Sequence, residues 1–225
     1  GVMEDFGQCT NWASTQIGND YVINVGQPIG QMYGYQSDGR YEVSDFDYNS
    51  GTGSYTLKAG VVNNTAVVGT VMPGTMKLKD IDGDGLVTIS DNAIIGNSNP
   101  KHFGGLNNTF KYKNFDLNLF FQWSYGNDIF NESKLREHGY QPAFNVTKEY
   151  YNNYWSETNP SNIYPGLGMI NILPSSYFVE DGSFLRLKTL GLGYNVSNKI
   201  LRKSGMSSVR FSVTATNLLT WTKYT

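Results

Sequence analysis

The clearest pattern along the chain is a strict alternation of apolar and polar residues in its second half. Between Phe115 and Trp123 every second side chain is apolar, and the residues between them are mostly polar. Residues 106–112, 185–188 and 209–216 alternate in the same way. A period of two places successive side chains on opposite faces of a β-strand. The pattern therefore predicts several strands, each with one apolar face and one mostly polar face.

The connections between these strands differ greatly in length. Lys113 and Asn114 alone separate the first two strands, which predicts a β-hairpin, and residues 197–207 join the last two. More than 50 residues, about 126–181, lie between the two pairs. Short turns on one side and long loops on the other are typical of outer-membrane barrels. Each strand also has the roughly 9–11 residues that cross a bilayer when tilted.

The alternation by itself fits two environments. In a soluble β-sandwich the apolar face points to a protein core, whereas in a membrane barrel it contacts lipid and the polar face lines an aqueous interior. The long connection is uncommon in a compact sandwich, and aromatic residues stand near strand ends, where a membrane-interface girdle lies. These aromatic residues are Trp123, Tyr125, Tyr177, Phe178, Trp221 and Tyr224. The residue pattern alone leaves both architectures open.

The first half of the chain is richer in loops. Residues 21–25 and 29–35 are short strand candidates, and the polar stretch 41–70 predicts an extended loop or a small hairpin. The single cysteine, Cys9, excludes an internal disulfide, and the net charge of −2 does not suggest a nucleic-acid partner. The chain begins without a secretory signal and ends shortly after a strand, so we expect it to be a piece of a longer protein.

One motif points to metal chemistry. Residues 80–91 read D-x-D-x-D-G-x-x-T-x-x-D, which matches the spacing of an EF-hand loop, with glycine at the sharp turn in position 6. The expected ligands are Asp80, Asp82, Asp84, the Leu86 carbonyl, Thr88 and Asp91. Carboxylates packed this closely repel one another unless a hard cation lies among them, and Ca²⁺ suits such a loop better than Mg²⁺. Because the flanks do not resemble helices, we expect a structural calcium loop; the alternative is a metal-free Asp-Gly turn.

The long connection is rich in aromatic residues. Flat rings stack on sugars, but the same side chains serve equally well at a protein interface or in the packing of the loop itself. The candidate ligand- or partner-binding residues are Tyr140, Tyr150, Tyr151, Tyr154, Trp155 and Tyr164. His102 and His138 are far apart in sequence, and Glu149, Glu157 and Asp181 are scattered loop acids. We therefore expect a protein that is not an enzyme.

Several short blocks, in series, resemble the SusC/RagA group of TonB-dependent receptors. Each block is weakly specific alone, but together they follow the order of the family and cover most of the chain from Gly26 onward. The blocks are residues 26–35 with Asp38-Gly39, 73–100 including the acidic loop, 104–117, 126–131, 177–194 and 215–224. The resemblance is to the C-terminal part of these outer-membrane proteins.

The resemblance implies an all-β fold: antiparallel strands of a large transmembrane β-barrel, incomplete here, with long extracellular loops. It also implies uptake of glycans or oligopeptides through the cell outer membrane of Bacteroidetes-like bacteria. The implied partners are outer-membrane lipid, a TonB complex acting through an N-terminal plug, and a SusD-like surface lipoprotein that forms a lid.

On this basis we expect three segments. Residues 1–72 would hold barrel strands and an extracellular loop or hairpin, 73–100 the calcium-binding loop, and 101–225 the C-terminal barrel strands with the long loop 126–181. Two alternatives remain: a soluble, calcium-stabilised carbohydrate-binding β-domain and an accessory module of a secreted hydrolase.

Overall fold

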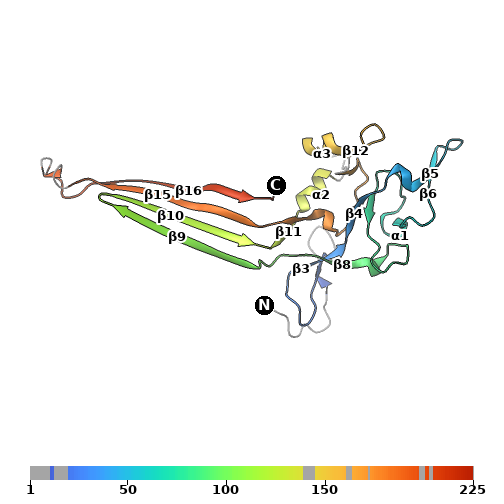
Figure 1. The fold of residues 1–225 in the computed structure, drawn as a ribbon, viewed down its shortest axis with the longest axis horizontal. Coiled ribbons are helices and arrows are strands. Elements are labelled where there is room, and N and C mark those ends of the chain that lie inside the picture. Colours follow the sequence, from blue (N-terminus) through green and yellow to red (C-terminus); the bar gives the residue numbers. More distant parts are fainter. Residues whose placement is uncertain are drawn as a thin grey trace. The chain divides into compact units, whose positions relative to one another are not determined.

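A computed structural model describes residues 11–12, 20–138, 145–160, 164–171, 173–197, 201–202 and 205–224 (Figure 1). The chain forms two compact units, each made of two separate stretches. Unit 1 comprises Gly1–Ser98 and Ile129–Val179, and unit 2 comprises Asn99–Asp128 and Glu180–Thr225. The division into three segments expected from the sequence stays a prediction.

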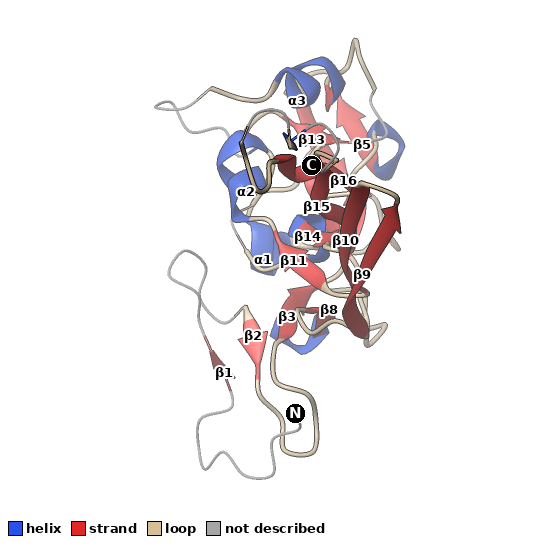
Figure 2. Cartoon of the chain, turned by 90° about the vertical axis from the view of Figure 1, so that its left-hand side faces the viewer, coloured by secondary structure: helices blue, strands red, loops and turns tan. Residues whose placement is uncertain are grey.

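Unit 2 is a four-stranded antiparallel sheet in the order β16-β15-β10-β9. Its strands are β9 (His102–Tyr112), β10 (Phe115–Tyr125), β15 (Phe184–Asn195) and β16 (Arg210–Thr222), and they run side by side in Figures 1 and 2. The predicted hairpin is confirmed, because Lys113 and Asn114 connect β9 to β10 and Tyr112 pairs with Phe115. Lys113 adopts a φ of 52°, the left-handed conformation that a two-residue hairpin turn requires.

The register of this sheet places most apolar residues of the four strands on one face. Leu117 lies opposite Phe110 on one side and Leu192 on the other, and Leu192 lies opposite Val213. Residues directly across a ladder point to the same face, so the strands together form a continuous apolar surface. The opposite face holds every Lys, Arg and Asp of the four strands: Lys111, Asp116, Arg186, Lys188 and Arg210.

Aromatic rings gather at both ends of the apolar face, with mostly aliphatic residues between them. The group at the hairpin-turn end is Tyr112, Phe115, Tyr194 and Phe211. The group at the other end is Trp123, Tyr125 and Trp221. Eight steps of about 3.4 Å, or about 27 Å, separate Phe115 from Trp123 along the strand. That length is comparable with the roughly 25 Å apolar band, edged by aromatic girdles, of outer-membrane barrels.

The sheet of unit 2 has a single layer. Among the described residues of this unit, Leu187 and Leu201 are the apolar side chains that are buried, whereas Phe211 and Val213 are 64% and 72% exposed. A β-sandwich would need a second sheet packed against this surface. The described part of unit 2 has none, so the apolar face of this sheet is exposed within the unit.

Unit 1 contains short strands and helices. Its first strands are β1 (Asn11–Trp12), β2 (Tyr21–Val22), β3 (Gln31–Tyr35) and β8 (Asn92–Asn97), which form one sheet in that order. Three pairs follow: β4 (Ser37–Arg40) with β7 (Met76–Leu78), β5 (Phe46–Asn49) with β6 (Ser54–Leu57), and β12 (Tyr154–Trp155) with β13 (Tyr164–Gly166). The helices are α1 (Thr65–Val68), α2 (Glu132–His138) and α3 (Lys148–Asn153), with 3₁₀ turns at Val43–Asp45, Ile89–Asp91 and Ser176–Phe178. The chain passes from one unit to the other between Ser98 and Asn99, and again within β11 (Asp128–Phe130) and β14 (Val179–Asp181), two strands that pair with each other.

Most local expectations for unit 1 are confirmed, with differences at element ends. The hairpin expected within residues 41–70 is β5–β6. The strand expected at 21–25 stops at Val22, because Gln27 donates a backbone hydrogen bond to Asn24 and closes a turn there. The connection 126–181 is not only loop: it contains α2 and α3, and the Thr147 hydroxyl caps α3 by accepting a hydrogen bond from the Tyr150 backbone.

The core of unit 1 draws on segments far apart in the sequence. One cluster of buried residues is Tyr35, Met76, Leu78, Val87, Tyr150, Ile170 and Phe178. A smaller cluster is Tyr41, Phe46 and Val71. Unit 1 therefore buries apolar side chains within itself. In the part of the chain that the structure describes, no helix is both long and apolar enough to span a membrane.

We expect an added charge to cost more stability on the apolar face of the unit 2 sheet than on its polar face. Leu119 lies near the middle of β10 on the apolar face, and Thr214 lies on the polar face of β16. We expect Leu119→Arg to lower the free energy of unfolding by about 2–4 kcal/mol in lipid vesicles, because arginine would enter hydrocarbon. Thr214→Arg is the matched control and should change it by less than about 1 kcal/mol. Urea unfolding measures both, and equal costs would contradict the lipid contact.

Candidate metal centre and aromatic cluster

The acidic loop is anchored to unit 1 by its own middle. It follows β7 and ends in the 3₁₀ turn Ile89–Asp91, which leads into β8. Val87 is fully buried in the larger core cluster. On either side of Leu86, the Asn63 N–H donates to the Gly85 carbonyl at 2.9 Å and the Val87 N–H donates to the Asn63 carbonyl at 2.8 Å. These contacts fix the loop while its acidic part stays at the surface.

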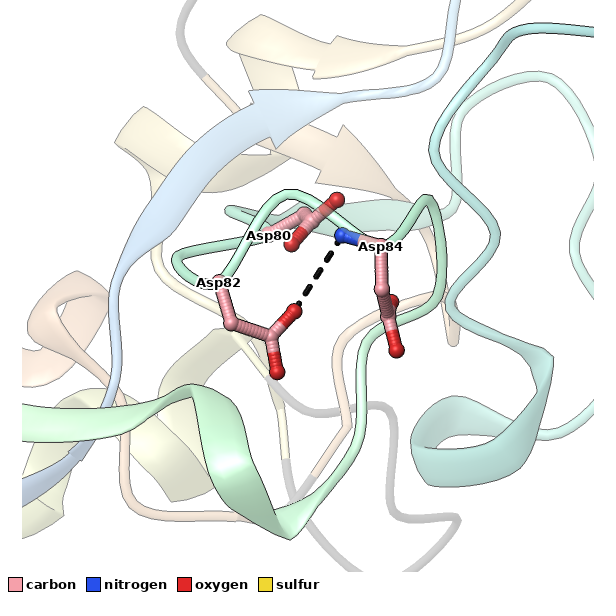
Figure 3. A group of neighbouring side chains, drawn as sticks. All are labelled: Asp80, Asp82 and Asp84. Atoms are coloured by element: carbon pink, nitrogen blue, oxygen red, sulfur yellow. Dashed lines mark hydrogen bonds between the residues drawn. The ribbon is translucent and has the colours of Figure 1, made fainter.

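Three carboxylates converge at the start of the loop. The ligand oxygens of Asp80, Asp82 and Asp84 lie within 4.8 Å of one another, and Figure 3 shows the three side chains around one bend of the ribbon. The chain bends there through Gly83 and Gly85, both with positive φ, which glycine adopts without strain. The sequence expectation that these three carboxylates lie together is met by the geometry.

Backbone N–H groups already bind these carboxylates. Asp80 accepts hydrogen bonds from Gly83 at 2.6 Å and Gly85 at 2.7 Å, and the dashed line in Figure 3 marks the Asp84 N–H donating to Asp82. That hydrogen bond lowers the pKa of Asp82, but desolvation and the charges of Asp84, Asp91 and Asp80 outweigh it and raise the pKa above its usual value. Like charges are therefore crowded, which is the condition that a bound cation relieves.

Asp91, the expected last ligand, lies at the base of the loop outside that group of three. Its side chain is fully buried and accepts backbone hydrogen bonds from Ile81 at 2.7 Å, Thr88 at 2.8 Å and Asp82 at 3.4 Å. Although burial raises the pKa of Asp91, these hydrogen bonds outweigh it and lower the pKa. Asp91 therefore ties the two ends of the loop together as a carboxylate.

The remaining two expected ligands have local roles in the structure. The Thr88 hydroxyl accepts a hydrogen bond from the Ser90 backbone and so caps the 3₁₀ turn. Leu86 forms a parallel bridge with Asn63, and its side chain is 49% exposed. Of the six residues expected to bind metal, the structure thus gathers three side chains into one group and uses the others to shape the loop.

Two of the aromatic residues expected to contact a ligand or partner are core residues instead. Tyr150 is fully buried, stacks on His138 with ring centroids 4.7 Å apart, and donates a hydrogen bond to the Gly166 carbonyl at 3.0 Å. Trp155 is 7% exposed and packs on Gly74, where an added Cβ would come within 2.2 Å of its ring. Both rings pack inside unit 1, so the expectation that they contact a ligand or partner is corrected for these two positions.

The other expected aromatic residues differ in exposure. Tyr154 and Tyr164 are half-buried, and the Tyr164 hydroxyl donates to Glu149 at 2.8 Å. Tyr151 is 63% exposed and is available to a partner. Tyr140 lies outside the described residues.

His138 is the residue whose surroundings sequence reasoning missed. Its Nδ1 lies 2.8 Å from the Tyr177 hydroxyl, and Lys134 lies over the Tyr177 ring at 4.7 Å. Burial raises the pKa of the Tyr150 and Tyr177 hydroxyls, which therefore stay protonated. No local sequence signal could reveal this cluster, because its members come from separate segments.

The loop acids considered for sugar hydrolysis are engaged separately. Glu149 accepts from Tyr164, Glu157 accepts from the Tyr55 hydroxyl at 2.9 Å, and Asp181 of unit 2 accepts from the Ser183 backbone at 2.9 Å. These hydrogen bonds assign each carboxylate a part in holding its own segment.

Comparison with curated proteins finds relatives of one kind. The chain is 38% identical over 203 residues to TonB-dependent receptor P3 of Formosa agariphila, a match covering 90% of this chain and 19% of that receptor. It is 32% identical over 154 residues to TonB-dependent receptor P26 of the same organism, covering 67% of the chain and 16% of the receptor. The chain thus spans about a fifth of the length of the curated relatives it matches. No protein-family model matches it.

Comparison with solved structures finds the same fold. A structure of the RagAB peptide transporter matches with a TM-score of 0.69 and 22% identity, covering 99% of this chain and 22% of that chain. The RagAB peptide importer in its open-open state matches with a TM-score of 0.65 and 20% identity, covering 99% and 22%. The unit 2 strands are accordingly part of a barrel wall that is not closed within this chain. The chain belongs to the TonB-dependent receptor family.

Proposed function

We propose that this chain works as part of an outer-membrane transporter that imports glycans or oligopeptides. The single observation that carries the proposal is the two-faced sheet of unit 2, with an apolar face bounded by aromatic rings and a polar face that holds all the strand charges. Outer-membrane lipid contacts the first face, and the water-filled passage for the substrate runs along the second. This role is transport, and it requires no catalytic residues.

Partners follow from the same proposal. Import is driven by a TonB complex, and a SusD-like surface lipoprotein closes the outer mouth. The long connection that builds part of unit 1 belongs on the extracellular side, because it leaves the sheet at the strand ends opposite the Lys113–Asn114 turn. Within this long connection, Tyr151 has the exposed ring that best suits a contact with a partner protein. Membership of the TonB-dependent receptor family and the fold shared with RagAB structures support these assignments.

Uptake by cells tests the transport role. The whole receptor that carries this chain is produced in an outer membrane, and the entry of labelled oligopeptides and oligosaccharides is measured separately. We expect uptake of one class, falling to background when TonB is deleted, because transport against a gradient needs that energy source. A host without the receptor is the control. Recovery of the receptor in another cell fraction, or uptake independent of TonB, would contradict the proposal.

The acidic loop is proposed to bind Ca²⁺ in a structural role. Asp80, Asp82 and Asp84 supply oxygen ligands, which hard cations prefer, and the two glycines leave room for a close approach. With its middle pinned by Val87 and Asn63, the loop can close around an ion without disturbing the core. The crowding of negative charge at Asp82 supports this assignment.

Calorimetry tests the calcium loop. We expect the double variant Asp82→Ala, Asp84→Ala to lose the heat of Ca²⁺ binding, since it removes two of the three gathered carboxylates. Asp47→Ala, a change at an exposed carboxylate on β5, should keep that heat and serves as the matched control. Binding heat that is the same in the double variant and the wild type would eliminate the site.

A further inference from the structure

The polar face of the unit 2 sheet carries an excess of positive charge. Its strands hold four cations, Lys111, Arg186, Lys188 and Arg210, and one carboxylate, Asp116. Arg210 binds both oxygens of Asp116 at 2.7 Å, which neutralises that carboxylate near the hairpin-turn end. Lys111 lies opposite the same carboxylate in the ladder, so no carboxylate of these strands is left for Arg186 and Lys188.

Arg186 and Lys188 gather around one neutral residue, Gln122. Arg186 lies directly opposite Gln122 in the ladder, and the Lys188 Nζ donates to the Gln122 Oε1 at 3.0 Å. The Arg186 Nε donates to the Thr220 hydroxyl at 3.0 Å. Among the described residues, the partners found for these two side chains are neutral oxygens, an amide and a hydroxyl. The pair can therefore exchange weak acceptors for a carboxylate, which binds cations more strongly.

A β-bulge concentrates the two cations. The register between β10 and β15 passes from Phe120–Thr189 to Phe121–Leu187, which leaves Lys188 as an extra residue. The neighbouring strand β16 is irregular at the same level, where Asn217 has a φ of 53°. Bulges re-aim side chains and occur preferentially next to functional sites. Here the bulge directs Lys188 toward Gln122 on the face that already holds Arg186.

Phenylalanine rings interrupt the polar pattern beside these cations. Phe184 and Phe103 both lie opposite Ser124 on the polar face, and Phe103 is 77% exposed. The Arg186 guanidinium lies over the Phe184 ring at 5.1 Å, an arrangement that holds its fork in a fixed plane. Phe103 is thus an exposed ring on a mostly polar face, beside the Phe184 ring that carries the Arg186 guanidinium. Rings beside a cation pair suit a ligand that carries both an anionic group and an apolar or flat part.

We propose that Arg186 and Lys188 form a binding subsite for a carboxylate of the transported substrate, with Phe184 and Phe103 contacting the neighbouring part of that molecule. This inference rests on the proposed transport function, which makes the polar face the wall of the substrate passage. Cations that line a passage select anions by raising their local concentration and by binding them directly. The substrate class is therefore acidic oligomers: oligopeptides with acidic side chains, or oligosaccharides of uronic acids.

Binding to the purified whole receptor in detergent tests the subsite. The probes are a glutamate-rich oligopeptide with its glutamine counterpart, and an oligogalacturonate with the neutral galactose oligomer. We expect one acidic probe to bind more tightly than its neutral counterpart, and Arg186→Gln and Lys188→Gln each to weaken it about tenfold, the value of a hydrogen bond to a charged group. The neutral probe should be unaffected, and the acidic probe that binds identifies the source of the carboxylate.

Lys111→Gln is the matched control, because it removes one positive charge from the same face near the hairpin turn. It should leave the preference for the acidic probe unchanged. Equal binding of acidic and neutral probes by the wild type overturns the proposal. Such a result is expected if another segment of the receptor neutralises the cations. An unchanged preference in both glutamine variants overturns the proposal as well.

A second measurement on the wild type covers the case in which the variants fail to assemble. Raising the salt to about 1 M, where the Debye length is about 3 Å, should weaken acidic binding and leave neutral binding unchanged. Insensitivity to salt would contradict the subsite. Because binding needs no energy source, loss of TonB-dependent uptake with intact acidic binding would refute the transport role and not the subsite.

Discussion

A sheet that is one layer thick cannot bury an apolar face by itself, and this constraint governs the rest of the molecule. In water such a face would need a second sheet or a cover of helices, because the free energy of exposed apolar area scales with its size. The described part of unit 2 supplies neither, yet its four strands align their apolar residues in register. Hydrocarbon is the surrounding that satisfies this arrangement, and the aromatic rings at both ends suit the boundary between lipid and water.

Unit 1, in contrast, buries its apolar side chains in a core of its own. Its apolar side chains converge from β3, β7, α3 and the acidic loop into a buried cluster. The loop at residues 80–91 illustrates how the placement of surface side chains depends on that packing. Val87 enters the core, Asp91 closes the base of the loop, and the three remaining carboxylates are thereby held at the surface in one group. A flexible acidic segment without this anchor would hold the same charges apart.

The polar face of the unit 2 sheet shows how the single-layer sheet also fixes where charged side chains lie. Because one face of the sheet is apolar, every charge of the strands lies on the other face, which the proposed function makes the wall of the passage. Arg210 and Asp116 cancel, whereas Arg186 and Lys188 rest on neutral oxygens beside exposed rings. Under the proposed carboxylate subsite, selectivity for anions arises from strand residues of the sheet.

The sequence by itself determined the features that depend on local spacing. The two-residue period gave the strands and their faces, Lys113-Asn114 gave the hairpin, and the D-x-D-x-D-G spacing gave the gathered carboxylates, because each rests on residues a few positions apart. Only the tertiary structure decided that Tyr150 and Trp155 are buried, that Asp91 closes the loop base, and that Lys188 sits on a bulge. The physical reason is that burial and register depend on segments distant in the chain. His138 meets Tyr177 across 39 positions and Arg210 meets Asp116 across 94, and no local pattern encodes such contacts.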